Sequence, residues 1–275
     1  MQTTSFDQMT GSFFEDLAKR QAALDTLLCV GLDPDLSKLP ERYLAGADPI
    51  VTFCKDVIDA TCDLVGCFKP QFAHFAAAEA LPALMEVIAY CHDKNVPVIL
   101  DAKRGDVGST SSFYAREAFD VYGADAVTVN PYLGGDSLEP FLEREDKGVI
   151  LLCRTSNPGG ADLQNLKLAS GVEVYEQIAS MAANEWNDNE NVGLVVGATR
   201  PEELKRVRTI VGEMTLLLPG IGAQGGDISA SLAAGAGGGL IVSSSRAVLY
   251  PEGGEMAAVR AEAEETRLSL NQHRQ

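Results

Sequence analysis

Several features that mark common classes of protein are missing from this sequence. No apolar run in its 275 residues approaches the roughly 20 residues that a membrane-spanning helix needs. The N-terminal stretch MQTTSFDQMTGSFFEDLAKR has no basic segment followed by an apolar one, the pattern of a secretory signal peptide. We therefore expect a protein that works in the cytoplasm without a membrane partner.

Closely spaced metal ligands are also lacking. The six cysteines include no C-x-x-C pair, and the three histidines stand apart from one another and from any obvious nucleophile. Zinc sites need clustered ligands, and disulfide frameworks belong mainly to small secreted chains. We expect reduced, mostly buried thiols, no metal site and no histidine-based catalytic triad.

Positive charge is scarce. The chain has 22 Lys and Arg against 39 Asp and Glu, which gives a formal net charge of −17. Such a chain repels nucleic acids and anionic membranes, so neither is expected as a partner. An anionic small molecule would have to be held by a few focused cations and backbone N–H groups.

What the sequence does contain is a regular alternation of strand-like and helix-like segments. Eight short apolar segments have the length and turn-residue boundaries of buried strands, at 27–33, 64–70, 96–103, 124–132, 148–157, 192–199, 215–222 and 238–246. Helix-like segments lie between them at 49–62, 75–94, 111–123, 137–146, 172–186 and 201–212. Thr199 stands three residues before Glu202, with Pro201 between them, which is a capping-box pattern for the start of the last of these helices.

This alternation predicts an α/β fold, specifically a (β/α)8 TIM barrel formed by one domain over residues 1–275. A doubly wound sheet would usually have fewer strands. Residues 1–25 include the amphipathic segment SFFEDLAKRQAAL and are expected to form a helical extension that closes the bottom of the barrel. Residues 256–275 are expected to form a C-terminal helix and tail.

The third predicted strand, in VPVILDAKRGDVGST, runs directly into the densest mixed-charge cluster of the chain. In a barrel, the active site lies at the C-terminal ends of the strands. The alternation of side chains along a strand places Asp101 and Lys103 on the same face, toward the barrel mouth, and Arg104 toward the helices. The charged strand end is therefore a candidate active site.

Two neighbouring residues extend this cluster. Lys69 ends the preceding strand, and Asp106 lies in a turn just beyond Lys103. The cluster then alternates lysine and aspartate, in the order Lys69, Asp101, Lys103 and Asp106. Carboxylates on both sides favour the ammonium form of Lys103, which suits a proton donor and opposes a Schiff-base nucleophile. The alternative is a purely structural role, in which these residues form salt bridges that close the barrel edge.

A candidate anion site follows the last two strands. LLLPGIGAQGGD supplies Gly220, Gly222, Gly225 and Gly226, and VSSSR ends at Arg246. Barrels commonly bind phosphate at these two loops, where glycines let backbone N–H groups approach the oxygens and an arginine completes the site. Glycine-rich turns alone are weak evidence, but their combination with the arginine favours phosphate binding.

Both motifs resemble those of the orotidine 5′-phosphate decarboxylase family. DAKRGD followed by VGST is similar to that family's D-x-K-x-x-D and trailing threonine, and PGIGAQGGD followed by SSSR is similar to its phosphate-gripping loop and arginine. The resemblance extends from Asp33 to Arg246 and is strongest to the longer bacterial class. It implies cofactor-independent decarboxylation of orotidine 5′-phosphate to uridine 5′-phosphate in pyrimidine biosynthesis, by a homodimer with shared active sites.

The resemblance also implies roles for the charged residues. Lys103 would donate the proton to C6, and Asp101 would face the carboxylate that departs. Asp33 and Lys69 would contact the ribose hydroxyls and complete the charge network. Two residues would reach across the dimer interface to the partner's ribose, namely Asp106 and Thr110.

The remaining implied contacts are with the phosphate and the pyrimidine. The phosphate group would be held or enclosed by residues of the last two loops, namely Pro219, Gly220, Gln224, Gly225 and Arg246. Ser156 would read the pyrimidine edge, although Thr155 and Asn157 in the same RTSN segment are competing hydrogen-bonding groups. The NPY segment at 130–132 receives no role.

Two alternative functions stay open. One is a magnesium-dependent sugar-phosphate decarboxylase or hexulose-phosphate synthase of the same superfamily, which shares the D-x-K-x-x-D strand. Those enzymes place a metal-binding carboxylate at the end of the second strand, where this sequence has Lys69, a cation that would repel the ion. The other is a non-catalytic barrel that binds a phosphate-bearing ligand.

Overall fold

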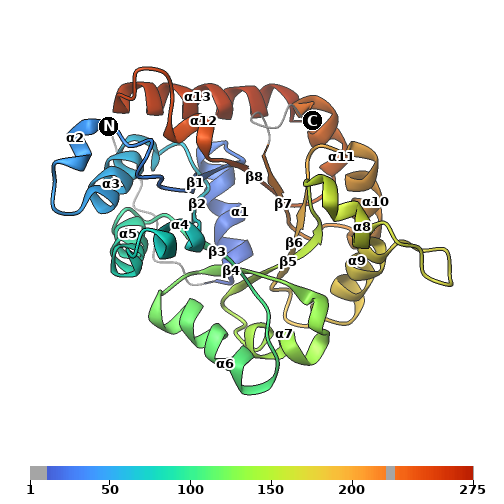
Figure 1. Ribbon diagram of the computed structural model, residues 1–275. Helices are drawn as coiled ribbons and strands as arrows, with labels where there is room; N and C mark the ends of the chain where they lie inside the picture. The colour runs from blue at the N-terminus through green and yellow to red at the C-terminus, as the bar shows by residue number, and fades with distance from the viewer. Residues whose placement is uncertain (1–10, 221–226, 275) are drawn as a thin grey trace.

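Parallel strands form a barrel that is ringed by helices (Figure 1). The computed structural model describes residues 11–220 and 227–274. Within these residues, eight strands form one sheet in the order β2-β1-β8-β7-β6-β5-β4-β3. They are β1 (Leu28–Leu32), β2 (Cys67–Pro70), β3 (Ile99–Arg104), β4 (Ala126–Val129), β5 (Gly148–Arg154), β6 (Val192–Val196), β7 (Leu216–Pro219) and β8 (Leu240–Ser244). Parallel bridges from Phe68 to Val98 and from Gln71 to Asp101 close the barrel between β2 and β3, which confirms the predicted fold.

Helices follow the strands in the order that the sequence predicts. They are α1 (Phe13–Leu24), α2 (Glu41–Leu44), α3 (Pro49–Thr61), α4 (Phe72–Ala77), α5 (Leu81–Asp93), α6 (Gly108–Arg116), α7 (Gly135–Leu142), α8 (Ala161–Gln164), α9 (Val174–Asn184), α10 (Pro201–Val211), α11 (Ile228–Gly235), α12 (Arg246–Leu249) and α13 (Met256–His273). Short π and 3-10 helices add η1 (Glu117–Val121), η2 (Pro131–Leu133) and η3 (Pro158–Gly160).

Two local predictions about the helices were wrong. The segment 75–94 forms part of α4 and then α5, because Glu79 between them adopts a left-handed backbone with φ of 54°. The N-cap of α10 is Arg200, not Thr199, because the helix begins at Pro201, and no side-chain hydrogen bond caps it. The capping box therefore does not form at Thr199.

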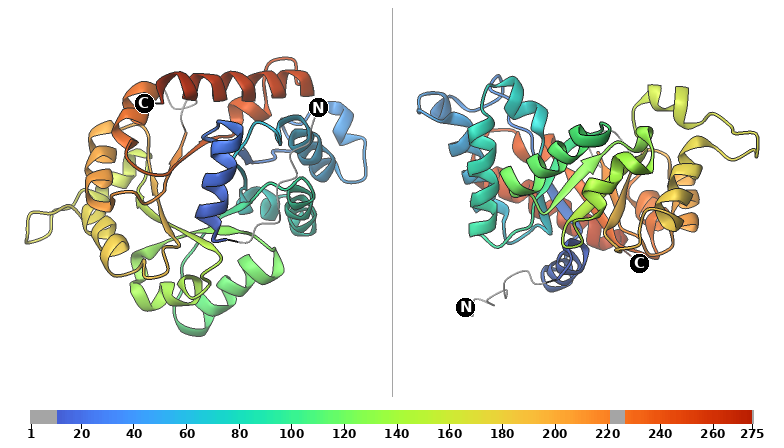
Figure 2. Two further views of the ribbon diagram at one scale, coloured as in Figure 1. Left: turned by 180° about the vertical axis from the view of Figure 1, so that it is seen from behind. Right: turned by 90° about the horizontal axis from the view of Figure 1, so that it is seen from below.

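Helix α1, which lies within the predicted extension of residues 1–25, closes the end of the barrel opposite the mouth (Figure 2, left). Its Phe13 and Leu17 pack against an inner layer to which each strand contributes one buried residue, namely Cys29, Cys67, Ile99, Ala126, Ile150, Val195, Leu217 and Ile241. The strand glycine Gly148 makes room for this helix, because a Cβ there would overlap the ring of Phe13. The barrel interior is therefore packed below the mouth, which leaves the strand ends above it for chemistry.

Most of the remaining apolar residues form a second core between the strands and the outer helices. All six cysteines are free and five of them are buried, as expected from their apolar surroundings. In the described ranges, we find no helix that is both long and apolar enough to cross a membrane.

Candidate active site

Three charged side chains meet at the barrel mouth. The Asp101 carboxylate receives one ion pair on each oxygen, from Lys69 Nζ at 2.8 Å and from Lys103 Nζ at 2.6 Å. Lys69 and Asp101 are buried, whereas 46% of the Lys103 side chain is exposed. The site thus contains a buried ion pair with a second ammonium group that reaches solvent, where it can meet a substrate.

The neighbouring charges determine how the buried pair ionises. Burial by itself would raise the pKa of Asp101, but the ammonium groups of Lys69 and Lys103 hold it well below its usual range. Burial by itself would lower the pKa of Lys69, but the carboxylates of Asp101 and Asp33 more than offset this and raise it. The buried pair is therefore ionised at neutral pH.

Lys103 reaches the mouth through an irregular strand end rather than through simple alternation. Its backbone is left-handed, with φ of 47°, a conformation that residues other than glycine seldom adopt. The pairing of β3 with β4 shifts register between Leu100 and Arg104, so this part of β3 is bulged. The expected convergence of Asp101 and Lys103 is present, but the bulge sets it. Backbone strain of this kind is often found at functional sites.

Thr128 of β4 is part of the site and was missed by the sequence interpretation. Its hydroxyl donates to Asp101 Oδ1 at 2.9 Å and accepts from the Lys103 backbone N–H at 3.0 Å. A buried polar residue in an otherwise apolar strand was the available signal. Thr128 holds both the carboxylate and the bulged backbone in place.

Arg104 points away from the mouth, as predicted. Its guanidinium donates to both Glu117 oxygens at 2.9 Å and lies over the rings of Phe72 and Tyr114. This packing between helices anchors the strand just beyond Lys103.

Asp33 lies just after β1 at the edge of the same site. One of its oxygens, Oδ1, is buried and has no hydrogen-bond partner among the described residues. The Tyr250 hydroxyl accepts from the Asp35 N–H at 2.7 Å and donates to the Asp33 carbonyl at 3.2 Å. Tyr250, also missed from sequence, thus ties the segment after β1 to the segment after β8. Asp33 Oδ1 thus keeps an unused capacity to accept a hydrogen bond at the edge of the site.

Asp106 does not join the charged array within this chain. Its Oδ1 accepts from the Val107 backbone N–H at 2.8 Å, and its carboxylate forms no ion pair with the described residues. Thr110 is exposed in the first turn of α6. The structure thus brings together Lys69, Asp101 and Lys103 but leaves these two residues outside the cluster.

The other predicted site residues lie at the ends of β5, β7 and β8. Ser156 follows β5 and is half-buried. Pro219 ends β7, and Gly220 follows it with a left-handed backbone, φ of 82°. Arg246 begins α12, is exposed and has no ion-pair partner within the part of the chain that the structure describes. Gln224 and Gly225 lie outside the described residues.

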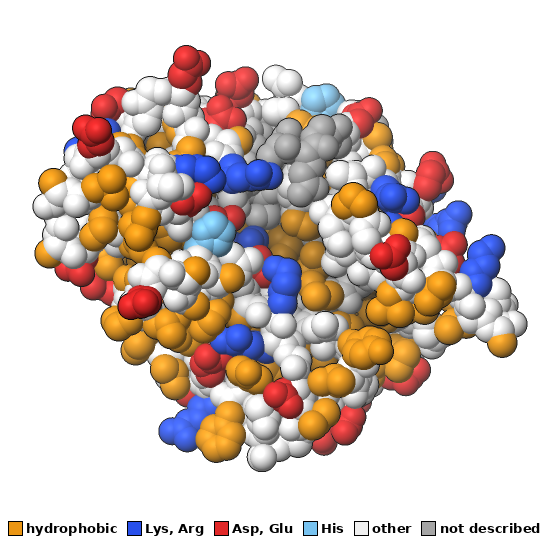
Figure 3. All heavy atoms as spheres, viewed as in Figure 1, with side chains coloured by type: hydrophobic (Ala, Val, Ile, Leu, Met, Phe, Trp, Pro, Cys, Tyr) orange, Lys and Arg blue, Asp and Glu red, His pale blue; other side chains and the backbone are white. Residues whose placement is uncertain are grey.

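The charge on this face differs from that of the whole molecule. Figure 3 shows lysine and arginine side chains around a hollow at the centre of the face that contains the strand ends. Over residues 11–220 and 227–274, no group of three His, Cys, Asp or Glu side chains is arranged to hold a metal ion. The mouth therefore offers cationic groups to an anion, in a protein whose net charge is −17.

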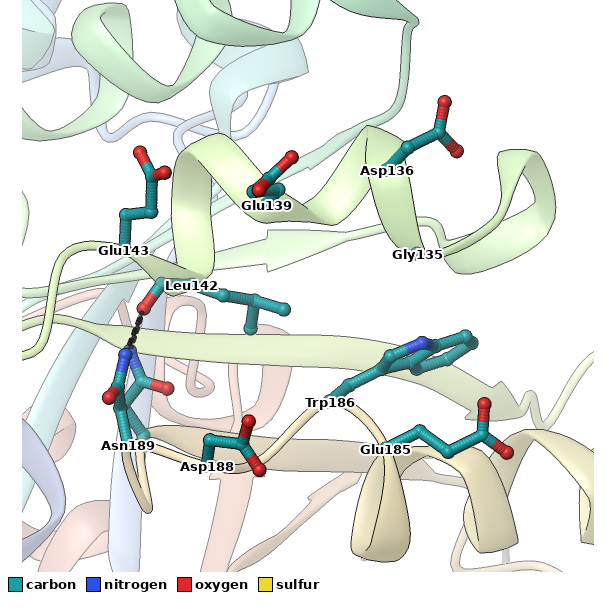
Figure 4. Close-up of a pocket in the computed structure, with 10 residues that line it drawn as sticks. Gly135, Asp136, Glu139, Leu142, Glu143, Glu185, Trp186, Asp188 and Asn189 are labelled. Carbon is teal, nitrogen blue, oxygen red and sulfur yellow. Dashed lines mark hydrogen bonds between the residues drawn. The ribbon is translucent and has the colours of Figure 1, made fainter.

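A separate groove of about 430 Å³ lies between α7 and the segment that joins α9 to β6 (Figure 4). Five carboxylates line it together with Trp186, and they come from Asp136, Glu139, Glu143, Glu185 and Asp188. Such walls would repel a phosphate-bearing substrate. The groove is therefore not a candidate for the anion site.

The fold and the mouth together define a class, a (β/α)8-barrel enzyme with a charged lysine and aspartate site. The model of the Orotidine 5′-phosphate decarboxylase / HUMPS family matches residues 26–261. This chain belongs to that family. It is also similar to curated proteins named orotidine 5′-phosphate decarboxylase. It is 57% identical to the one from Azoarcus sp. over 91% of this chain and 95% of the relative. It is 53% identical to the one from Dechloromonas aromatica over 96% of this chain and all of the relative.

Solved structures give the same assignment. OMP decarboxylase from Leishmania donovani is 41% identical, with a TM-score of 0.83 over 95% of this chain and 98% of that one. A putative orotidine-monophosphate-decarboxylase from Toxoplasma gondii is 38% identical, with a TM-score of 0.86 over 95% of this chain and 96% of that one.

Proposed function

We propose that this protein decarboxylates orotidine 5′-phosphate to uridine 5′-phosphate in pyrimidine biosynthesis without a cofactor. The observation that carries the proposal is the Asp101 carboxylate held between Lys69 and Lys103 at the barrel mouth. The names of the relatives, at 51–57% identity, support the same reaction.

This reaction requires a fixed positive charge close to C6 of the pyrimidine ring. When the bond between C6 and the carboxylate breaks, carbon dioxide leaves and the electron pair stays on C6, where the ring does not delocalise it. The exposed ammonium of Lys103 would stabilise this carbanion and then transfer a proton from Nζ to C6. Asp101 would face the departing carboxylate and hold Lys103 in place, and Lys69 balances the charge of Asp101 beneath them.

The substrate's other groups would be held around this centre. The unpartnered oxygen of Asp33 suits a ribose hydroxyl, and the exposed Arg246 suits the phosphate. Pro219, Gly220, Gln224 and Gly225 belong to the same proposal as the loop around the phosphate. Phosphate contacts remote from C6 can supply energy that raises turnover, provided that they position the reacting atoms.

The proposal includes a cytoplasmic homodimer in which Asp106 and Thr110 serve the partner's site. Apolar side chains next to the mouth support a partner surface there, because four large ones are exposed in the segments after β3 and β4, namely Val107, Phe113, Tyr132 and Leu133. The unpaired carboxylate of Asp106 lies in the first of these segments. A sedimentation measurement of molecular mass tests the dimer directly.

One assay separates this proposal from its alternatives. Orotidine 5′-phosphate is supplied, and conversion to uridine 5′-phosphate is followed by ultraviolet absorbance with and without an exhaustive chelator treatment. We expect the same turnover in both, because the ammonium of Lys69 occupies the position at which the magnesium-dependent relatives would place a metal-binding carboxylate. Loss of turnover that magnesium restores would favour those relatives. Binding without turnover would favour a non-catalytic barrel.

A further inference from the structure

A buried network around Arg154 holds the segment that follows β5. Arg154 ends β5 and is only 2% exposed. Its guanidinium lies 2.8 Å from the Glu203 carboxylate of α10. The Nη1 group donates to the Thr155 carbonyl at 2.6 Å and to Gln164 Oε1 at 3.1 Å. One buried cation thus joins the beginning of this segment to its end in α8.

Gln164 completes the network by using both ends of its amide on Thr155. Its Oε1 accepts from the Thr155 backbone N–H at 2.9 Å, and its Nε2 donates to Thr155 Oγ1 at 2.9 Å. The Thr155 hydroxyl in turn donates to Asn157 Oδ1 at 2.6 Å. A hydroxyl has one proton to donate, so Thr155 has none left for a ligand, and the side-chain carbonyl of Asn157 is already engaged.

Ser156, between these two residues, is held by its backbone and left free at its side chain. Gly197, just after β6, donates its N–H to the Arg154 carbonyl at 2.7 Å. A Cβ on Gly197 would lie 2.8 Å from both the N and the Cα of Ser156, so the two backbones are in close contact. No group in the described ranges hydrogen-bonds to the Ser156 hydroxyl.

We propose that Arg154 and Gln164 are positioning residues. They engage Thr155, and through its hydroxyl the side-chain carbonyl of Asn157, and leave Ser156 as the group of this segment that reads the pyrimidine edge. This inference rests on the proposed function. The edge of a uracil ring presents carbonyl acceptors and an N–H donor, and a hydroxyl can match either. A hydroxyl whose backbone is already held needs little rearrangement to meet the base, which preserves affinity and orientation.

The test compares Gln164→Ala with a matched control, Gln177→Ala. Gln177 lies in α9, and its side chain makes no hydrogen bond to the described residues. Dissociation constants are measured by calorimetry for uridine 5′-phosphate and for ribose 5-phosphate, which lacks the base. We expect Gln164→Ala to raise the dissociation constant for uridine 5′-phosphate about tenfold, because a site built to hydrogen-bond the base loses its alignment. It should leave ribose 5-phosphate unchanged, and the control should match the wild type for both.

A double-mutant cycle identifies the route of the effect. If Gln164 acts through Ser156, then Gln164→Ala has little further effect on kcat/KM in a Ser156→Ala background, whereas independent effects would multiply. Gln164→Glu keeps the oxygen that accepts from Thr155 and Arg154, so it should retain most of the affinity for uridine 5′-phosphate and provides a folded variant if the alanine variant is unstable.

Three outcomes overturn the inference. They are an equal loss of affinity for both ligands in Gln164→Ala, effects on kcat/KM that multiply in the double-mutant cycle, and wild-type affinity for uridine 5′-phosphate in Gln164→Ala. A wild-type protein that fails to convert orotidine 5′-phosphate would instead overturn the proposed function, so the two failures are distinguishable.

Discussion

At the scale of single residues, Lys103 is the group on which turnover should depend. Its side chain is 46% exposed and contributes little to the core, so Lys103→Ala should keep its fold and lose turnover. The loss should appear in kcat, because the ammonium acts on the transition state. Steady-state kinetics, together with circular dichroism to check folding, measure this. Near-normal turnover in the variant would show that Lys103 is not the proton donor.

Asp101 should link stability to pH. Asp101→Asn leaves the buried ammonium of Lys69 without its partner, which should lower the free energy of unfolding at pH 7 by about 3–5 kcal/mol. The pKa of Asp101 is lower in the folded state, so its stabilisation is complete above the unfolded-state pKa of about 3.9 and is lost as the pH falls through the folded-state value. The difference between variant and wild type should therefore narrow below about pH 4.

Denaturant unfolding between pH 3 and 8 measures this difference. Asp136→Asn is the matched control, because Asp136 is exposed and has no ion-pair partner in the described chain. A gap between Asp101→Asn and wild type that is the same at both ends of the pH range would contradict the assignment.

At the scale of elements, the seating of α1 beneath the barrel depends on a strand glycine. Gly148→Ala places a Cβ that would overlap the Phe13 ring and lie 2.9 Å from the Cβ of Ala126. Such overpacking should cost about 1–3 kcal/mol in the free energy of unfolding. Because α1 lies at the end of the barrel opposite the mouth, kcat should change little.

The control for this variant is Gly46→Ala, an exposed position where the nearest atom to an added Cβ is the Tyr43 carbonyl oxygen at 3.4 Å. Its effect should stay within about 0.5 kcal/mol. Denaturant midpoints compare the two variants, and equal midpoints would mean that α1 does not pack as tightly as the contacts indicate.

At the scale of the whole molecule, shared active sites can be tested by mixing two inactive variants. If Asp106 serves the partner's site, a heterodimer of Lys103→Ala and Asp106→Ala has one site with both defects and one intact site. Random exchange makes half of the dimers heterodimers, so about a quarter of wild-type activity should return. Activity is measured after exchange has been verified by mass or by a label. No recovery would place Asp106 within its own chain's site.

The order of strands and helices, and the charged residues at the strand ends, could be predicted from the sequence. Buried parallel strands are recognisable as short apolar runs, and the closing of a barrel brings their C-terminal ends together whatever the details of packing. This is why Lys69 and Asp101, which are far apart along the chain, are correctly predicted to lie at one mouth. The resemblance to the family comes separately, from the motifs DAKRGD and PGIGAQGGD.

Only the tertiary structure decided how these residues are held. The left-handed backbone of Lys103 and its support by Thr128 depend on the register between β3 and β4. The engagement of Thr155 by Gln164, and the close approach of Gly197, just after β6, to the Ser156 backbone, depend on how the segment after β5 folds against its neighbours. Each of these contacts joins residues that are distant in the sequence, or whose spacing matches neither a helix nor a strand. Local pattern and propensity report which element forms, but the distances between elements are set by packing that no local window contains.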